Sequence, residues 1–393
     1  MMEMGESKST NYDDFDMVKL DHEDSSEGLF SPFTFIFFLV LIVLSGFLLL
    51  YSSTFDVSVK DGFEHYHYFL NQVIGFSAGL FLGLCLDFLP LRFIKKSYYF
   101  LCPLSLVVLV LMLFPSFNDC GIFTISGHNI ISGPILGAFS VISLISGAIP
   151  SIYKRKEING VYFVIVALIA IAIAILSALV SSMGYYFLIV SVSIIMLRST
   201  GAKKGFVAIC AVFALSTALF LIFVYSPFSS SFFSSILPVA NPDFYDHSLF
   251  VSQLAIKEGG LTGIGLGKGL YKLGVLSNVE SDFIFASISE ELGFVGVFFF
   301  FVAFLNYFFL GIMAARRAYR KNEYTIASAC IALSSIVVVQ ALISALYCAG
   351  IFPFGPVSFP FFSYCPSAEF MFVTSSLILY RYIYLMGRSN EKV

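Results

Sequence analysis

The sequence predicts an all-α membrane protein with ten transmembrane helices, both termini inside, and one large external loop between the seventh and eighth helices. The first observation is composition: 58% of the 393 residues are hydrophobic and 12% are charged, whereas about a quarter of the residues in soluble domains are charged. The second is a series of long apolar runs, and the third is the distribution of Lys and Arg between them. Together they predict that most of the chain lies in lipid.

Ten apolar runs are long enough to cross the membrane as helices, since a hydrocarbon core of about 30 Å needs about 20 residues. In chain order they are approximately 32–53, 68–86, 98–115, 133–150, 160–179, 183–198, 205–226, 288–314, 324–348 and 367–386. Only Ser181, Ser182 and Gly184 mark a turn between the fifth and the sixth run.

The basic residues set the orientation, because Lys and Arg in short loops stay on the cytoplasmic side. With the N-terminus inside, four basic residues fall outside: Lys60, Lys257, Lys268 and Lys272. The other 18 of the 22 fall inside. This asymmetry favours a multi-pass membrane protein with ten spans and both termini in the cytoplasm.

The ends of the chain differ from this apolar body. Residues 1–30 hold nine acidic residues and two Lys, which predicts a disordered acidic cytoplasmic tail and no cleavable signal peptide. Residues 31–386 form the predicted membrane domain and 387–393 a short cytoplasmic tail. The seven cysteines are scattered and form no CxxC pair, so neither a disulfide framework nor a metal site is indicated.

The predicted external loop, about 227–287, contains a glycine-rich run from Gly259 to Gly269. Such a run can bring backbone amides close to a phosphate, and Lys268 and Lys272 would add positive charge. The spacing differs from that of a nucleotide-binding P-loop. The alternative is a flexible loop whose glycines, Gly260 and Gly265 among them, only permit turns.

Asp282 is the candidate catalytic acid, because it stands where the polar loop meets the apolar run of the eighth span. Partial desolvation there would raise its pKa and make it a usable base. The alternative is that Ser281 or Asp282 caps the following helix. If the helix continues from Asp282, Glu290 lies about 80° around the axis and could share its cavity, whereas Glu291 faces another helix.

Three other groups carry weaker signals. Asp243, Asp246 and His247 could bind a divalent metal, but three ligands without a second cluster favour a solvated loop and no metal site. Glu369 lies just inside the tenth span and could face a cavity. The first external loop presents a polar, exposed face: Lys60, Glu64, His65 and His67.

Several ordered motifs resemble the SEDS proteins, the shape, elongation, division and sporulation family. The main match runs from Ser252 through the glycine-rich stretch to Asp282-Phe283-Ile284-Phe285-Ala286 and Glu290-Glu291-Leu292-Gly293. Further matches are Tyr51-Ser52-Ser53, and Phe359 to Tyr364 after Pro353. The details Gly263 to Gly267 and Lys272-Leu273-Gly274 look more like the division branch than the elongation branch.

The resemblance implies a glycosyltransferase of a bacterial inner membrane that polymerises lipid II, the undecaprenyl-pyrophosphate disaccharide-peptide, on the outer face of that membrane. It implies a class B penicillin-binding protein transpeptidase and other divisome proteins as partners, and no nucleic acid. Asp282 matches the family's essential acid, and Ser363 and Tyr364 match a motif expected near substrate. No cofactor is certain; Lys268, Lys272, the glycine amides or a divalent cation, Mg or Mn, could stabilise the departing pyrophosphate.

The first half of the chain departs from the family pattern. Ile122-Phe123 and Ser132 to Ile135 replace polar motifs before the fourth span, and Val180 to Gly184 replace an acidic turn. Cys365-Pro366 stands where the family has Gly-Gly, and Glu280-Ser281 where it has His-Thr. Two other functions therefore stay open: a non-catalytic scaffold that recruits the transpeptidase, and a lipid II flippase.

Overall fold

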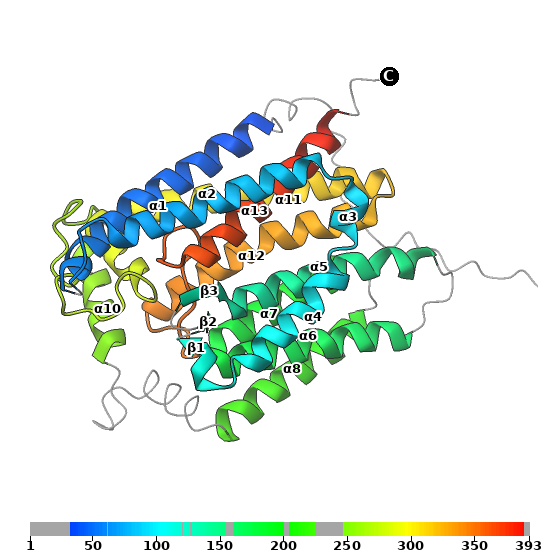
Figure 1. The fold of residues 1–393 in the computed structure, drawn as a ribbon, viewed down its shortest axis with the longest axis horizontal. Coiled ribbons are helices and arrows are strands. Elements are labelled where there is room, and N and C mark those ends of the chain that lie inside the picture. Colours follow the sequence, from blue (N-terminus) through cyan, green and yellow to red (C-terminus); the bar gives the residue numbers. More distant parts are fainter. Residues whose placement is uncertain are drawn as a thin grey trace, which may run out of the picture.

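The chain folds into a bundle of long helices whose axes lie roughly parallel (Figure 1). The structure is a computed structural model that describes residues 32–60, 62–119, 121–125, 128–154, 160–199, 204–224 and 247–388. Its helices are α1 (Pro32–Lys60), α2 (His67–Phe88), α3 (Leu91–Lys95), α4 (Tyr98–Leu111), α5 (Gly133–Lys154), α6 (Gly160–Val180), α7 (Met183–Ser199), α8 (Lys204–Val224), α10 (His247–Gly259), α11 (Ile284–Arg320), α12 (Tyr324–Cys348) and α13 (Pro366–Arg388).

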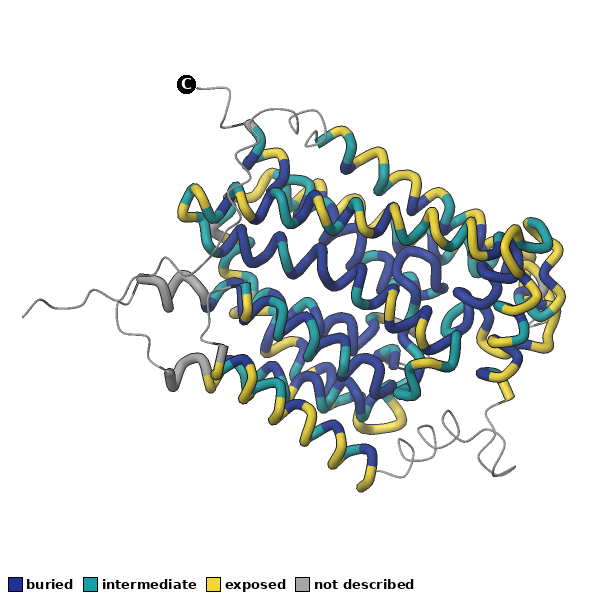
Figure 2. The backbone as a smooth tube through the Cα atoms, turned by 180° about the vertical axis from the view of Figure 1, so that it is seen from behind, coloured by how far each residue is buried: buried dark blue, intermediate teal, exposed yellow. Residues whose placement is uncertain are grey.

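The buried residues lie between the helices, and exposed apolar residues cover the outer helices (Figure 2). This is the pattern of a protein that faces lipid, where water does not select for a polar surface. Figure 1 also shows the start of α1 and the end of α13 at one end of the bundle, with α10 at the opposite end. The acidic tail 1–30 lies outside the described residues, as does the C-terminal tail beyond Arg388.

Each of the ten predicted spans coincides with a helix, which confirms the predicted helical membrane fold in its coarser form. Among the described residues, six helices are long and apolar enough to cross a membrane: α1, α2, α8, α11, α12 and α13. The described apolar stretches of α4, α5, α6 and α7 are shorter. The count of ten spans and the orientation of the termini therefore stay predictions.

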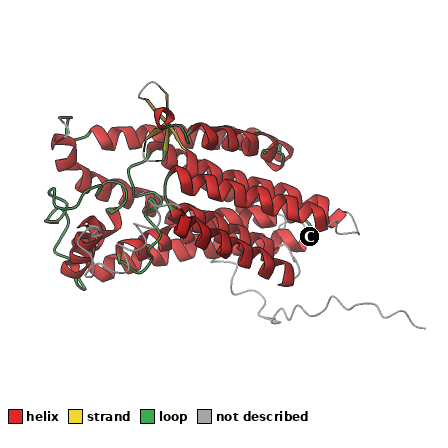
Figure 3. Cartoon of the chain, turned by 90° about the horizontal axis from the view of Figure 1, so that it is seen from below, coloured by secondary structure: helices red, strands yellow, loops and turns green. Residues whose placement is uncertain are grey.

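The expectation of an all-α chain is wrong between α4 and α5. A short 3-10 turn, Pro115–Phe117, leads into a three-stranded antiparallel sheet in the order β1 (Asn118–Asp119), β2 (Ile122–Ile125) and β3 (His128–Ser132). The strands are the only yellow elements in Figure 3. The β-branched residues of this connection favour extended backbone, and the run is too short to be distinguished from a loop by apolar periodicity.

The predicted external loop also contains structure of its own. Residues 225–246, including Asp243 and Asp246, lie outside the described residues, but α10 fills much of the remainder and begins at His247. The following helix begins at Ile284, four residues before the predicted start. The described part of the loop, from His247 on, is therefore folded and lies at one end of the bundle.

Three glycines of α2, Gly75, Gly79 and Gly83, form a stripe that packs against α13. A Cβ on Gly75 would overlap the carbonyl of Pro366, and a Cβ on Gly79 would lie 2.6 Å from the carbonyl oxygen of Phe370. Small residues let helix backbones approach closely, which is a common way to join helices in lipid. The stripe therefore fixes α2 directly on α13.

The far end of the same interface is closed by Arg381 of α13. Its guanidinium donates to the carbonyl oxygens of Leu86 at 2.7 Å and Leu89 at 2.9 Å, and lies 3.8 Å from the carboxylate of Asp87. The Leu86 carbonyl also accepts from the Leu89 amide at 3.1 Å, so the cation adds to the cap of α2 at the end where the helix dipole favours positive charge.

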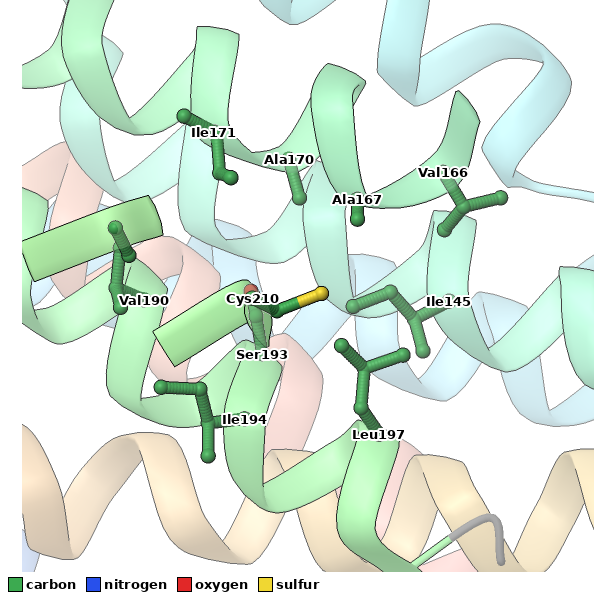
Figure 4. A pocket seen from close by; sticks show the side chains of 11 residues that line it. Ile145, Val166, Ala167, Ala170, Ile171, Val190, Ser193, Ile194, Leu197 and Cys210 are labelled. Carbon is green, nitrogen blue, oxygen red and sulfur yellow. The ribbon is translucent and has the colours of Figure 1, made fainter. Parts of the chain in front are cut away.

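A small cavity lies among α5, α6, α7 and α8 (Figure 4). Its volume is about 30 Å³, and its walls are mostly aliphatic side chains such as Ile145, Val166 and Leu197. Because its walls offer almost no polar group, we expect it to stay dry. We interpret it as a packing defect.

Replacing Gly79 by Ala tests the glycine stripe. The added methyl group meets backbone, so we expect a loss of about 1–3 kcal/mol of stability, seen as a lower melting temperature of the purified protein in detergent. Gly205→Ala in α8 is the control, because a Cβ there meets nothing within 4 Å. An equal melting temperature for Gly79→Ala and wild type would contradict this packing.

Candidate active site

The helix α11 is interrupted at Gly293, which has φ 65° and ψ −171°. In an unbroken helix, the amides of Phe294 and Val295 would donate to carbonyls four residues earlier. Here they donate to the glycine-rich loop: Phe294 to the carbonyl of Gly260 at 2.9 Å and Val295 to that of Leu261 at 3.1 Å.

The carbonyls left free by this break also bind the loop. The amide of Ile264 donates to the carbonyl of Glu290, and the amide of Gly265 to that of Glu291, both at 3.0 Å. Gly263 lies so close that a Cβ would overlap the carbonyl of Glu291, and its φ is 73°. The two lost helical bonds are thus replaced by four bonds between the loop and the helix.

This arrangement explains the glycine-rich run without a phosphate. The amides of Ile264 and Gly265 donate to α11, and the amide of Gly263 donates to the carbonyl of Gly259 at 2.8 Å. These three amides therefore have partners within the protein and form no free cradle. The substrate contacts predicted for Gly260 and Gly265 stay predictions.

Lys272 forms a buried ion pair with Glu291. Its ammonium also donates to the carbonyl oxygen of Ser52 at 3.0 Å and to the Ser52 hydroxyl at 2.8 Å, and this hydroxyl donates to Glu291. Because an ammonium has three donors, all of them are used here. Glu291 thus faces another helix, as predicted, whereas the structure gives Lys272 an internal role. Lys268 is exposed, and its substrate contact stays a prediction.

Glu290 is bound to the loop by its carboxylate. Its Oε1 accepts from the amides of Leu270 at 2.6 Å and Tyr271 at 3.3 Å. The angle calculated between Asp282 and Glu290 does not apply, because the helix starts after Asp282. The structure therefore gives Glu290 a role in holding the loop.

Asp282 lies in a tight turn immediately before α11. Asn278 has a left-handed φ of 51°, and its carbonyl accepts from the amides of Ser281, Asp282 and Phe283 at 3.1–3.2 Å. The residue that precedes the helix is Phe283, and no side chain caps this end. The capping alternative is therefore wrong, and the half-buried carboxyl of Asp282 is available for other contacts.

The surroundings of Asp282 favour its protonated form. Burial raises the pKa of Asp282 from 3.8 to about 6, the nearby charge of Glu280 raises this pKa as well, and a hydrogen bond from Asn278 lowers it. An acid with this pKa is ionised at neutral pH yet holds a proton more strongly than an exposed aspartate. It is thus suited to accept a proton from a substrate.

Ser363 and Tyr364 hold the turn in place. The hydroxyl of Ser363 donates to the carbonyl of Ser281 at 2.7 Å, and the amide of Tyr364 donates to the carbonyl of Glu280 at 2.7 Å. The motif before α13 is thus brought next to Asp282, as the resemblance predicts. Direct contact of Ser363 or Tyr364 with substrate stays a prediction.

Two residues near Asp282 carry no sequence signal. Tyr185 of α7 and Cys348 of α12 lie within electrostatic reach of its carboxylate, and the Cys348 thiol donates to the Asp282 carbonyl at 3.6 Å. Each stands in an apolar run without a motif, so only the fold could reveal them. Ser52, in contrast, does carry a sequence signal, because it belongs to the Tyr51-Ser52-Ser53 match.

An open cavity of about 420 Å³ lies beside Tyr364, at the start of α2. The amide of Asn71 donates to the Tyr364 hydroxyl at 3.3 Å and so joins this cavity to the turn of Asp282. The polar first loop contributes to its wall, which is lined by Gly62, Phe63, Glu64, Tyr66, His67, Leu70, Asn71 and Ile74. In the described part of the chain, no three His, Cys, Asp or Glu residues come together as a metal site.

The break in α11 can be tested with Gly293→Ala. Residue 293 has a positive φ, and the added Cβ would overlap the backbone of Gly263. Together these should lower the stability by more than the about 1–3 kcal/mol typical of backbone strain alone, and thermal unfolding in detergent would detect this loss. Gly267→Ala is the matched control, because its φ is 77° and a Cβ there meets nothing within 4 Å. If both variants lose the same stability, the close packing of loop and helix is disproved.

The ion pair can be tested by a double-mutant cycle. Lys272→Met leaves Glu291 buried and unpaired, which we expect to cost about 3–5 kcal/mol, whereas adding Glu291→Leu should restore part of that stability. Thermal unfolding of the two single variants and the double variant measures the coupling. Additive losses would show that the pair contributes nothing.

Comparison with known proteins agrees with this architecture. A family model of cell cycle proteins, FtsW/RodA/SpoVE, matches residues 33–384. A probable peptidoglycan glycosyltransferase FtsW of Borreliella burgdorferi is 27% identical over 83% of this chain and 89% of its own length. The protein of the same name from Bacillus subtilis is 26% identical over 88% of this chain and 89% of its own length. These relatives confirm the predicted resemblance to the division branch.

Solved structures show the same fold at lower identity. A chain of a peptidoglycan synthase complex superposes with a TM-score of 0.69 at 18% identity, covering 90% of this chain and 98% of that one. The rod shape determining protein RodA of Thermus thermophilus gives 0.61 at 18% identity, covering 89% and 95%. The family match spans nearly the whole chain and confirms the resemblance to SEDS proteins, so this chain belongs to the FtsW/RodA/SpoVE family of cell cycle proteins.

Proposed function

We propose that the protein is a peptidoglycan glycosyltransferase that polymerises lipid II on the outer face of the inner membrane during cell division. The observation that carries this proposal is Asp282, a half-buried acid with a pKa of about 6 at the membrane end of the loop. The names of the FtsW relatives support the reaction class. An acid that is partly desolvated yet ionised at neutral pH is the group that a glycosyl transfer needs as a base.

In this mechanism, Asp282 takes the proton from the 4-hydroxyl of the acceptor sugar. The hydroxyl oxygen then forms a bond to the anomeric carbon of the donor sugar, and the bond from that carbon to the pyrophosphate breaks. The lipid pyrophosphate leaves with the bonding electrons. The cavity of about 420 Å³ beside Tyr364 lies within the 300–1,000 Å³ range of small-molecule sites and offers room for sugar units.

Charge on the leaving pyrophosphate must be stabilised. Lys268 is an exposed cation of the glycine-rich run, whereas Lys272 would first have to leave Glu291. A divalent cation, Mg or Mn, would arrive with the pyrophosphate, since its phosphate oxygens are good ligands for such ions. The likeness to a chain of a peptidoglycan synthase complex supports a transpeptidase partner, for which we propose a class B penicillin-binding protein.

Activity should depend on Asp282 and on pH. With the partner, divalent cation and labelled lipid II supplied, Asp282→Asn should polymerise at least about 100-fold more slowly, because general-base catalysis contributes about 10²–10⁴-fold. The wild-type rate should rise with pH through about 6, as Asp282 loses its proton. Glu280→Gln removes a neighbouring negative charge, so it should move this rise to lower pH and keep activity at neutral pH.

Three outcomes would contradict parts of this proposal. If the wild type makes no glycan polymer under these conditions, the enzyme interpretation fails and the scaffold remains. If Asp282→Asn polymerises normally, the base is another group. If Glu280→Gln leaves the pH profile unchanged, Asp282 does not set that profile.

A further inference from the structure

Gln72 of α2 is buried and makes three hydrogen bonds to one short segment of the chain. Its Nε2 donates to the carbonyl of Ser363 at 3.2 Å and to Oε2 of Glu369 at 3.4 Å. Its Oε1 accepts from the amide of Cys365 at 3.1 Å. The side chain therefore binds this segment on both sides of Tyr364.

Glu369, in the first turn of α13, is 2% exposed. Gln72 donates to its Oε2, but its Oε1 has no hydrogen-bond partner among the described residues. A buried acid at membrane depth is costly, and such a residue is rarely kept without a role.

Three groups fix the orientation of the Gln72 amide: the carbonyl of Ser363, the amide of Cys365 and the carboxyl of Glu369. If this amide were turned around, its oxygen would face the Ser363 carbonyl and its NH₂ group would face the Cys365 amide, so two acceptors and two donors would oppose each other. Because Glu369 accepts from Nε2, it favours the orientation in which all contacts are complementary.

The segment that Gln72 holds is the one that holds the catalytic turn. Ser363 donates to the carbonyl of Ser281, and Tyr364 donates to that of Glu280. The amide of Phe359 also donates to the Ser363 hydroxyl, at 2.6 Å, and so holds this hydroxyl in place. A continuous set of hydrogen bonds therefore runs from Glu369 to the residue before Asp282.

We propose that Gln72 and Glu369 are positioning residues that fix the segment Ser363–Cys365 and, through it, the turn that carries Asp282. The effect on catalysis rests on the proposed function, whereas the positioning itself does not. Without the pair, the turn loses its support and Asp282 becomes more accessible to water. Among the described residues, the titratable groups within electrostatic reach of Asp282 are Glu280, Tyr185 and Cys348, and the side chain of Asn278 donates to it. The thiol of Cys365 lies near Glu369.

The test compares Gln72→Leu and Glu369→Leu with Thr374→Val. Thr374 lies on the same α2–α13 interface and donates to the carbonyl of Gly79 at 3.1 Å, but it has no bond to the segment Ser363–Cys365 in the described structure. All three variants remove a buried polar contact between α2 and α13, and only the first two remove the positioning pair. Glu369→Gln keeps an acceptor for Gln72 and serves as the conservative variant.

The first readout is the pH profile of polymerisation. Gln72→Leu and Glu369→Leu should move the rise in rate to lower pH by about one unit, because burial is the main cause of the raised pKa of Asp282 and hydration removes this cause. Thr374→Val should keep the wild-type profile, and Glu369→Gln should restore most of it. A profile that is unchanged in both leucine variants would overturn the effect on catalysis.

The second readout does not require activity. Asp282→Cys, alone and combined with each variant, is reacted in detergent with a water-soluble maleimide, after the signal of the native cysteines is measured in protein without this substitution. We expect labelling several-fold faster with Gln72→Leu or Glu369→Leu and unchanged with Thr374→Val. Equal labelling in all variants would overturn the positioning. If the leucine variants are labelled faster but the wild-type protein shows no polymerisation, only the proposed function is refuted.

Discussion

The structure depends on one constraint: inside an apolar protein facing lipid, every backbone N–H and C=O needs a partner. A break in a membrane helix is therefore possible only where another backbone satisfies the freed groups. At Gly293 the loop from Gly260 to Gly265 does so with four hydrogen bonds. The glycines are needed because the two backbones touch, and this contact anchors the loop at a fixed position along α11.

The anchored loop determines where the charges lie. Because the loop is bonded to the carbonyls of Glu290 and Glu291, the side chain of Lys272 comes within reach of Glu291 and of Ser52 in α1. Glu290 holds the next part of the loop through the amides of Leu270 and Tyr271. Only a short stretch of chain then remains before α11, and this stretch ends in the turn that contains Asp282.

Sequence reasoning succeeded where a single segment contains the signal. Apolar runs located the helices, and the loop-to-helix boundary together with a motif singled out Asp282 as the candidate, which the structure places in the turn just before α11. It was insufficient where the partner is distant: nothing adjacent to Lys272 shows that Glu291 neutralises it, and Gln72 and Glu369 are 297 positions apart. The sheet was missed because strands of two to five residues are shorter than any reliable periodicity.

The first half of the chain lacks several charged family motifs, but it still supplies the site. Ser52, Gln72 and Tyr185 come from α1, α2 and α7, and each offers a neutral hydrogen-bonding group. Neutral groups cost less to bury in lipid than charges do, so their contacts can persist where charged motifs have been lost. A scaffold would need none of these contacts near a half-buried acid, because binding a partner makes no demand on the pKa of Asp282. The buried and hydrogen-bonded surroundings of that acid therefore favour catalysis over assembly alone.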